Sequence, residues 1–281
     1  MQICVLSGKG GAGKTFVATN LFAVADHGSY IDCDVEEPNG HIFFHDTDPQ
    51  SQPVTKLIPQ IDPETCTLCN ACVDFCKFKS LVNILDSIMF FDDMCHSCGG
   101  CAYVCPNHAI AEVPFHVGEI YKSTYKEKSV YTGTLDIAQA SGSAIISQLI
   151  AQASTEELAI VDCPPGSDCS VMDSITDADF CLVVVEPTIF GAHNMKMVVE
   201  LLQIFHKPFG VVFNKGFEDS YPELERYIQQ HTGHVLGSIP FSEKAAKASS
   251  EGLLASEEDQ EMADFFKDLL KKVIMWAAKN N

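Results

Sequence analysis

The sequence predicts an α/β fold in which a mostly parallel sheet carries helices on both faces and a small α+β domain is inserted. Three observations predict it. Short apolar runs alternate with helical patterns in the first and last parts of the chain, as in a parallel sheet covered on both sides. A glycine-rich turn joins the first apolar run to the first helical pattern. Between residues 59 and 112 cysteines gather and long helical patterns vanish.

The elements before the cysteine-rich segment are short. Residues 3–6 are apolar and predict a buried strand. Apolar residues at helical spacing predict a helix over 14–25, and residues 30–32 predict a second strand. The stretch from Asp46 to Pro53 is rich in Pro, Asp and Gln, so we expect it to break regular structure.

The α/β pattern returns after the cysteine-rich segment. Buried parallel strands are expected at residues 158–162, 180–185, 209–213 and 235–239. Helices are expected between and after them, at 195–205, 221–230 and 257–279. We therefore divide the chain of 281 residues into a discontinuous α/β domain, residues 1–58 and 113–281, and an inserted domain, residues 59–112.

The charge balance argues against some classes of partner. The formal net charge is −20, and Arg226 is the sole arginine. Proteins that bind nucleic acid or anionic membranes depend on Lys and Arg, so we expect neither partner. No run of 18 apolar residues and no secretory signal is visible. The 13 cysteines therefore indicate metal or redox chemistry in a reducing cytoplasm, and we expect a cytoplasmic protein.

A phosphate-binding loop follows the first strand, because residues 8–15 read GKGGAGKT. Glycines let backbone N–H groups turn toward phosphates, and the helix N-terminus adds positive potential. In such a loop the Lys14 ammonium reaches the β- and γ-phosphates, and the Thr15 hydroxyl ligates Mg²⁺. We expect the following residues to bind the nucleotide: Gly8, Lys9, Gly10, Gly11, Ala12, Gly13, Lys14, Thr15 and Phe16.

A dinucleotide-binding fingerprint competes with this interpretation. The loop glycines also spell G-x-G-x-x-G, and Asp32 or Asp34 lies near the spacing of its ribose-binding acid. The Lys-Thr pair favours a P-loop NTPase, since a pyrophosphate site needs neither an ammonium nor a metal-binding hydroxyl. Asp162 supports the P-loop from the end of a buried strand, where such enzymes hold Mg²⁺. A helix-capping aspartate is the alternative at that position.

The cysteine-rich segment contains two runs, from Cys66 to Cys76 and from Cys95 to Cys105, each spaced C-x2-C-x2-C-x3-C. This is the spacing of bacterial ferredoxins, which hold two [4Fe–4S] clusters and lend the fourth cysteine of each run to the other cluster. Zinc also binds C-x2-C pairs, but a zinc site needs only four ligands. We therefore expect cluster I on Cys66, Cys69, Cys72 and Cys105, and cluster II on Cys76, Cys95, Cys98 and Cys101.

Lys9 gives the loop the form K-G-G-x-G-K-T, which resembles the deviant Walker A motif of the MinD/ParA/Mrp/nitrogenase-iron-protein superfamily. With its cysteine runs, the chain resembles MinD-superfamily P-loop ATPases that contain an inserted ferredoxin-like domain with two [4Fe–4S] clusters. The resemblance extends to residues 32–39 (DCDVEEPN), 160–166 (IVDCPPG), 185–188 (VEPT) and 213–215 (FNK).

The resemblance implies roles for individual residues. Lys9 matches the signature lysine that crosses a dimer interface to the partner's nucleotide, and Asp34 matches the acid that orients the attacking water. Asn214 matches the residue at the adenine edge, with Pro240 near the base. The implied catalytic residues are Lys9, Lys14, Asp34 and Asp162, and the implied Mg²⁺ ligands are Thr15, Asp34 and Asp162. Relatives form ATP-sandwich dimers, so a homodimer or a heterodimer with a similar paralogue is expected.

Five cysteines lie outside the two runs: Cys4, Cys33, Cys163, Cys169 and Cys181. Cys4 and Cys181 fall in expected strands and are expected to fill the core. Cys169 stands seven residues after Asp162, as an interfacial cluster ligand does in the nitrogenase iron protein. The second ligand of that protein has no obvious match here, so a metal shared between two Cys169 side chains is a minor hypothesis.

The expected cofactors are ATP or ADP, Mg²⁺ and two [4Fe–4S] clusters, and three functions remain open. The leading hypothesis is a slow, partner-coupled ATP hydrolase that assembles or delivers a metal or iron–sulfur cofactor. The second is an ATP-gated, low-potential electron donor to a partner enzyme. The third is a redox-sensing positioning or scaffold ATPase with structural clusters. In all three, a partner protein that carries a metal cofactor or accepts electrons is expected.

Overall fold

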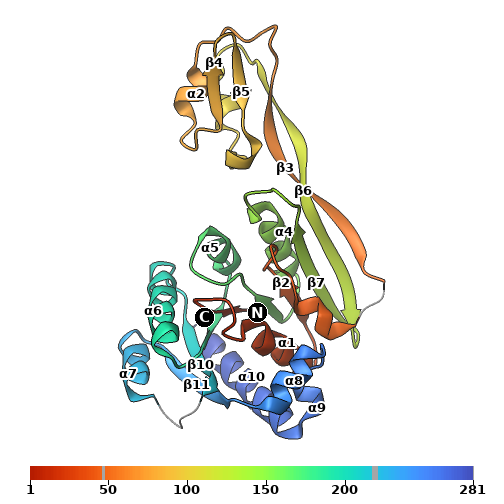
Figure 1. The fold of residues 1–281 in the computed structure, drawn as a ribbon, viewed down its shortest axis with the longest axis vertical. Coiled ribbons are helices and arrows are strands. Elements are labelled where there is room, and N and C mark those ends of the chain that lie inside the picture. Colours follow the sequence, from red (N-terminus) through yellow and green to blue (C-terminus); the bar gives the residue numbers. More distant parts are fainter. Residues whose placement is uncertain (46–47, 217–220, 281) are drawn as a thin grey trace.

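The computed structural model describes residues 1–45, 48–216 and 221–280. Figure 1 shows an α/β body, from which a long two-stranded ribbon projects to a small unit at its far end. The main sheet has nine strands in the order β11-β10-β9-β1-β8-β2-β7-β6-β3, and β4 pairs with β5 in a separate sheet. The first seven strands in this order, from β11 through to β7, are parallel to one another. Strand β6 runs in the opposite direction and pairs with both β7 and β3. The expected mostly parallel sheet is confirmed.

The strands are β1 (Gln2–Leu6), β2 (Ser29–Asp32), β3 (Gln50–Ile61), β4 (Leu81–Ile84), β5 (Ser87–Phe90), β6 (Ile110–Tyr125), β7 (Lys128–Leu135), β8 (Ala159–Asp162), β9 (Phe180–Val185), β10 (Phe209–Gly216) and β11 (His234–Pro240). The helices are α1 (Lys14–Val24), α2 (Ala71–Phe75), α3 (Gly100–Tyr103), α4 (Ser143–Ala153), α5 (Cys169–Ile175), α6 (Ile189–Ile204), α7 (Pro222–Gln230), α8 (Glu243–Ser250), α9 (Ala255–Glu258) and α10 (Gln260–Asn280). Two 3-10 turns, η1 (Gly40–Phe44) and η2 (Asp92–Met94), complete the described elements.

Two apolar cores lie on opposite faces of the sheet. One joins the central strands to α4, α5, α6 and α7, and the other joins them to α1 and α10. The central strands β1, β8 and β9 are buried along their whole length, which explains why their sequences are almost entirely apolar. No described helix is long and apolar enough to cross a membrane.

Several element boundaries differ from the sequence prediction. Helix α6 begins at Ile189 rather than at 195, because the Thr188 hydroxyl accepts a hydrogen bond from the N–H of Gly191 and caps the helix. The expected helix over 257–279 is divided at Asp259, which has extended backbone and a side chain that accepts the N–H of Glu261.

The irregular stretch expected from Asp46 to Pro53 is wrong in its second half. Residues 46 and 47 lie outside the described part of the chain, but β3 already begins at Gln50. Pro53 is tolerated there because β3 is the last strand in the sheet order and pairs only with β6.

The ribbon of β3 and β6 continues beyond the carboxyl edge of the parallel strands. Residue Gly118 of β6 pairs with Leu135, the last residue of β7, whereas the stretch of β6 from Ile110 to His116 pairs with β3 alone. Strand β7 runs parallel to β2, which ends at Asp32. The eight residue steps from Gly118 to Ile110 span about 26 Å at about 3.3 Å each. The ribbon therefore carries its far end away from the body, on the side where the parallel strands end.

Residues 62–109, called the tip unit below, form the small body at the end of the ribbon (Figure 1). The tip unit contains α2, α3, β4 and β5, and its Cys72 and Leu81 form an apolar cluster with Ile110 of β6. The domain boundaries proposed from the sequence, after residues 58 and 112, fall inside β3 and β6. Those strands are continuous across them, so the division into two domains stays a prediction.

Candidate nucleotide site and cysteine-lined cavities

The glycine-rich loop turns sharply before α1. Gly11 and Gly13 have φ angles of 78° and 91°, in the left-handed region that side chains disfavour. A Cβ atom on Gly13 would fall 2.0 Å from Asn214 Nδ2. Glycine is therefore required at position 13 both by the backbone angle and by the close approach of β10.

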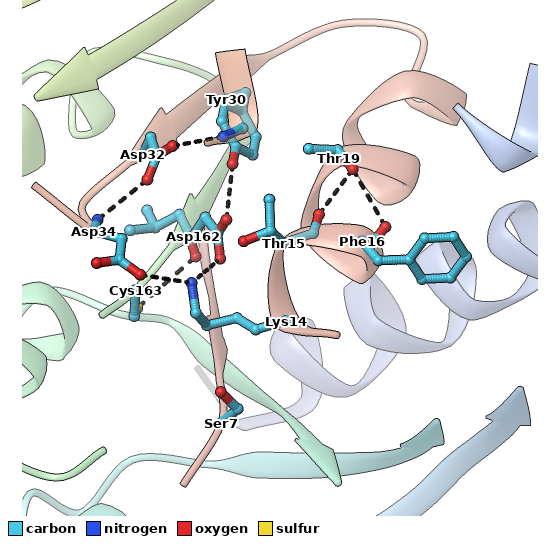
Figure 2. Close-up of polar contacts among 12 residues, drawn as sticks. Ser7, Lys14, Thr15, Phe16, Thr19, Tyr30, Asp32, Asp34, Asp162 and Cys163 are labelled. Atoms are coloured by element: carbon cyan, nitrogen blue, oxygen red, sulfur yellow. Dashed lines mark hydrogen bonds and ion pairs between the residues drawn. The ribbon is translucent and has the colours of Figure 1, made fainter. Parts of the chain in front are cut away.

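Lys14, the first residue of α1, points into a group of carboxylates (Figure 2). Its Nζ atom lies 2.6 Å from Asp162 Oδ1 and 3.8 Å from Asp34 Oδ2. Burial lowers the pKa of Lys14, but the nearby charges of Asp162 and Asp32 outweigh burial, so the pKa is raised. The ammonium therefore stays charged although it is buried. The expected positions of Lys14, Asp34 and Asp162 are thus brought together.

Asp162, at the end of β8, has a second partner that the sequence did not reveal. Its Oδ2 atom accepts a hydrogen bond of 2.8 Å from the hydroxyl of Tyr30, and both residues are completely buried. Burial and the Asp162 charge raise the pKa of Tyr30 well above its usual value. Tyr30 is therefore a permanent donor that holds Asp162 in place. Its only signal in the sequence was its position in the strand before Asp32.

Asp32 is a buried acid whose role also differs from expectation. Sequence reasoning considered it only as a ribose ligand, whereas its carboxylate accepts the backbone N–H groups of Asp34 and Gly40 at 3.1 and 3.0 Å. Burial and the neighbouring Asp162 charge raise its pKa to about 7, against the opposing effect of Lys14. Through these two hydrogen bonds Asp32 holds the segment that carries Asp34 in place.

The carboxylates suit a hard cation. Asp34 is partly exposed, with a side-chain accessibility of 19%, and burial raises its pKa although Lys14 lowers it. Thr15 lies next to Lys14 at the start of α1 (Figure 2). Carboxylate and hydroxyl oxygens are the ligand types that Mg²⁺ prefers. Asp34, Asp162 and Thr15 thus fit the predicted Mg²⁺ site in their chemistry.

Lys9 lies at the outer side of the loop. Its Nζ atom is 3.0 Å from Glu186 Oε2, and the two side chains are 35% and 23% exposed. Glu186 follows β9 and was not expected to take part in the site. The predicted role of Lys9 across a dimer interface stays a prediction.

Asn214 and Pro240 both reach the loop region. Asn214 is buried, and its Nδ2 atom donates to the Ala12 carbonyl at 2.8 Å. The Lys215 ammonium, which the sequence reasoning missed, donates to the Gly11 carbonyl at 2.8 Å. A cavity of about 380 Å³ is lined by residues that include Gly13, Phe16, Asn214, Lys215, Pro240 and Phe241. A nucleotide base on the loop would have this cavity beside it.

The cysteines of the two runs line two separate cavities in the tip unit. The first cavity is lined by Cys66, Cys69, Cys72 and Cys105. The second cavity, of about 130 Å³, is lined by Cys76, Cys95, Cys98 and Cys101. All eight are free thiols. The structure thus gathers the cysteines in the two interleaved groups that the spacing predicts, and their ligation of clusters stays a prediction.

The spacing of the thiols bears on what each cavity fits. Among the described residues, no three or more His, Cys, Asp or Glu side chains are arranged to hold one metal ion. A single zinc ion holds thiolates at about 2.3 Å, whereas a four-iron cluster binds its cysteines over a larger volume, one at each iron. Four thiols around the second cavity, of about 130 Å³, are compatible with the larger group, whereas the first cavity measures about 10 Å³ and would have to widen to hold it.

The other cysteines divide into a buried and an exposed class. Cys4 and Cys181 are buried, as expected, and so are Cys33 and Cys163. Cys169 is exposed at the start of α5. No observation tests the hypothesis of a metal shared through Cys169.

Two relatives match most of this chain in sequence. The chain is 27% identical over 281 residues to the uncharacterized protein MJ0578 of Methanocaldococcus jannaschii, covering 97% of this chain and 96% of that protein. It is also 27% identical over 226 residues to MJ0579 of the same organism, covering 78% and 82% of the two chains.

Solved structures resemble the fold at lower identity. The cell division ATPase MinD of Pyrococcus furiosus has a TM-score of 0.62 at 20% identity, with 98% of each chain covered. MinD of Pyrococcus horikoshii, complexed with Mg-ADP, has a TM-score of 0.62 at 16% identity, with 97% of this chain and 95% of that chain covered. Residues 3–255 match the family described as the CobQ/CobB/MinD/ParA nucleotide binding domain. The chain therefore belongs to this family of P-loop nucleotide-binding proteins.

Proposed function

We propose that this chain is a nucleotide-switched, dimeric ATPase that carries two [4Fe–4S] clusters in its tip unit and couples ATP binding and hydrolysis to the assembly or delivery of a metal or iron–sulfur cofactor. One observation carries the proposal. The ribbon holds the two cysteine-lined cavities beyond the carboxyl edge of the sheet, where Lys14, Asp34 and Asp162 also lie. A structural change caused by the nucleotide at that edge would therefore occur on the same side of the sheet as the cavities.

The ATP-binding part of the proposal is supported by the contacts of Lys14. Its ammonium pairs with Asp162, so an incoming γ-phosphate competes with that carboxylate for the lysine. Asp162, Asp34 and the Thr15 hydroxyl would hold Mg²⁺ when it is bound, and its charge would offset the repulsion between the phosphate and these carboxylates. Asp34, partly exposed and with a raised pKa, is suited to orient a water molecule near the γ-phosphate.

The dimer is supported by exposed apolar residues near the loop. Ile189 and Phe190, at the start of α6, are 90% and 77% exposed, and they follow closely after Glu186, the partner of Lys9. Large apolar side chains with such exposure are suited to a protein interface. A second subunit on this side would draw Lys9 away from Glu186 toward its own nucleotide. The occurrence of two similar chains in one organism leaves both a homodimer and a heterodimer of paralogues open.

The tip unit supports the redox part of the proposal. When bound, [4Fe–4S] clusters store and pass single electrons at low potential. Eight free thiols in two groups supply the ligands. The ribbon keeps these thiols at a distance from the body, so a partner protein has access to them.

An ATP-gated electron donor is the second candidate. Each four-cysteine group draws one member from the other run, and this interleaving is the arrangement of two-cluster electron carriers. In this case hydrolysis drives an electron to an acceptor enzyme, and no metal leaves the chain.

The test is an anaerobic capture of partners by the intact protein with Mg-ATP and with Mg-ADP, followed by metal analysis of the captured proteins. We expect capture to depend on the nucleotide and to fail for Lys14→Ala, while Lys244→Ala, an exposed lysine of α8, behaves like the wild type. Metal gained by the captured protein favours delivery, and its reduction without metal gain favours the electron gate. Anaerobically purified protein that contains no iron would refute the proposed function.

A further inference from the structure

The two cavities of the tip unit are built from equivalent positions of a sequence pseudo-repeat. Each cavity has a residue that follows the first cysteine of one run and a residue two places after the last cysteine of the other run. In the first cavity these residues are Thr67 and Asn107, joined by a hydrogen bond of 2.6 Å. In the second they are His96 and Phe78, whose rings stack at 3.6 Å and 18°. The pseudo-repeat therefore allows the cavities to be compared position by position.

The buried residue four places after the last cysteine of each run differs between the cavities in the hydrogen bonds that it offers to the cysteine sulfur. It is Ala109 after Cys105 and Ser80 after Cys76, and both residues are at most 4% exposed. In the first cavity the N–H of Ala109 donates to Cys105 Sγ at 3.3 Å. In the second cavity the Ser80 hydroxyl lies 3.1 Å from Cys76 Sγ. The hydroxyl is present only in the second cavity.

Ligation fixes the direction of this hydrogen bond. A cysteine bound to iron is a thiolate without a proton, so Ser80 must be the donor and Cys76 the acceptor. The surroundings of Cys76 thus stabilise negative charge on its sulfur, and water has little access to compete with the buried donor.

Other charges near the second cavity oppose one another. Lys77 lines it, where the first cavity has Pro106 at the equivalent place in the sequence, and the carboxylate of Glu112 lines it as well. Both side chains are exposed, so water screens each of them. The second cavity also has an N–H donor to sulfur, from Ser97 to Cys95 Sγ at 3.5 Å, but the Ser80 hydroxyl is the closer contact to a cysteine sulfur, at 3.1 Å.

We propose that Ser80 makes the group held by Cys76, Cys95, Cys98 and Cys101 the preferred electron acceptor of the two. Reduction adds negative charge to a cluster, and hydrogen bonds to its sulfur ligands raise its reduction potential by stabilising that charge. The inference rests on the proposed function, since it requires that both cavities hold clusters.

The positions of the two cavities along the ribbon indicate the direction in which an electron would move between them. The second cavity is lined by Leu57 and Pro59 of β3, and the first by Ile61 and Ile110, which are farther from the body along the ribbon. With both groups loaded, a one-electron carrier protein docked at the far end would give up one electron, which would reach the first group before the second. No bond forms or breaks, and no proton moves. The electron is therefore held on the side of the nucleotide site.

The test is a redox titration of the anaerobic, iron-loaded protein with dithionite, followed by electron paramagnetic resonance. We expect the wild type to show two separate reduction steps. Ser80→Ala should lower the potential of the upper step and leave the lower step in place. The matched variant, Ala109→Ser, should raise the lower step instead. Iron content and circular dichroism verify that each variant is loaded and folded, and Ser80→Thr keeps the hydroxyl and should restore the separation of the steps.

The outcomes separate this inference from the proposed function. Protein without iron would refute the proposed function and the inference together. Iron-loaded protein with coincident steps, or a Ser80→Ala variant in which only the lower step moves or neither does, would overturn the inference alone. ATPase activity is not needed for any of these measurements.

Discussion

Lys14 Nζ lies 2.6 Å from Asp162 Oδ1 in a buried ion pair that joins the first turn of α1 to the end of β8. The two side chains are 6% and 0% exposed. Asp162 also accepts the Tyr30 hydroxyl, so each of its oxygens has a partner. The pair neutralises two charges that neither helix nor strand could bury alone.

Asp162→Asn should destabilise the protein because it leaves the Lys14 ammonium buried with a weaker set of partners. Breaking a buried pair costs roughly 3–5 kcal/mol, and we expect the lower end of this range because Asp34 and Asp32 still attract Lys14. Chemical denaturation measures the change. The double variant Lys14→Met/Asp162→Asn should be more stable than Asp162→Asn. If the double variant is the less stable one, the pair is not the cause of the loss.

The sequence predicted the elements that the hydrophobic pattern determines. Central strands such as β8 and β9 were placed to within a residue, because burial on both faces leaves a continuous apolar run. The ribbon was missed, since β3 and β6 are mostly exposed or half-buried and contain prolines at 53, 59 and 114. Nothing local distinguishes such strands from loops, and their pairing is set by residues far apart in the chain.

The candidate site was predictable where its residues belong to a sequence motif with one known chemical role. The sequence spacing of Lys14, Thr15 and the eight cysteines is enough to predict what these residues bind. The roles of Tyr30, Asp32 and Glu186 were missed because they depend on partners outside any short motif: Asp162, the backbone of Gly40, and Lys9. Their partners lie more than 100 residues away in two of these cases, so no short motif contains them.

Asp32 should make stability fall as the pH rises from about 4 to about 7. Its pKa is raised to about 7 by burial and by Asp162, whereas an unfolded aspartate has a pKa of about 3.9. Between these values the folded state holds a proton that the unfolded state has lost, so stability decreases by up to about 1.4 kcal/mol per pH unit. Urea denaturation in EDTA across this range measures the slope, and Asp32→Asn should flatten it. A slope unchanged in that variant contradicts the assignment.

Gly13→Ala should abolish nucleotide binding, while Gly10→Ala should preserve the fold. A Cβ at position 13 meets Asn214 Nδ2 at 2.0 Å and requires a φ angle of 91°, whereas nothing lies within 4 Å of a Cβ at position 10. The left-handed angle alone costs about 1 kcal/mol or more for a residue with a side chain. Thermal unfolding and Mg-ATP titration check both variants. Equal behaviour of the two would show that the contact with Asn214 is not limiting.

Lys9→Ala should prevent ATP-dependent dimerisation without destabilising the monomer. Its ion pair with Glu186 is partly exposed, and such pairs contribute at most about 1 kcal/mol. Light scattering with a slowly hydrolysed ATP analogue measures the dimer. Lys244→Ala is the control, because Lys244 is paired with Asp259 but lies in α8. A dimer that forms equally well without Lys9 would remove the predicted role of this residue.

Cys76→Ser should affect the same cluster as Cys95→Ser although the two residues belong to different runs. Cys76 lines the second cavity with Cys95, whereas Cys105 lines the first with Cys66. Loss of one ligand should remove or alter one of two clusters, so iron content should fall by roughly half at most. The paramagnetic signal of the reduced protein identifies which cluster is changed. Cys105→Ser should instead share its signal change with Cys66→Ser, and a shared change between Cys76→Ser and Cys66→Ser would mean that each run binds its own cluster.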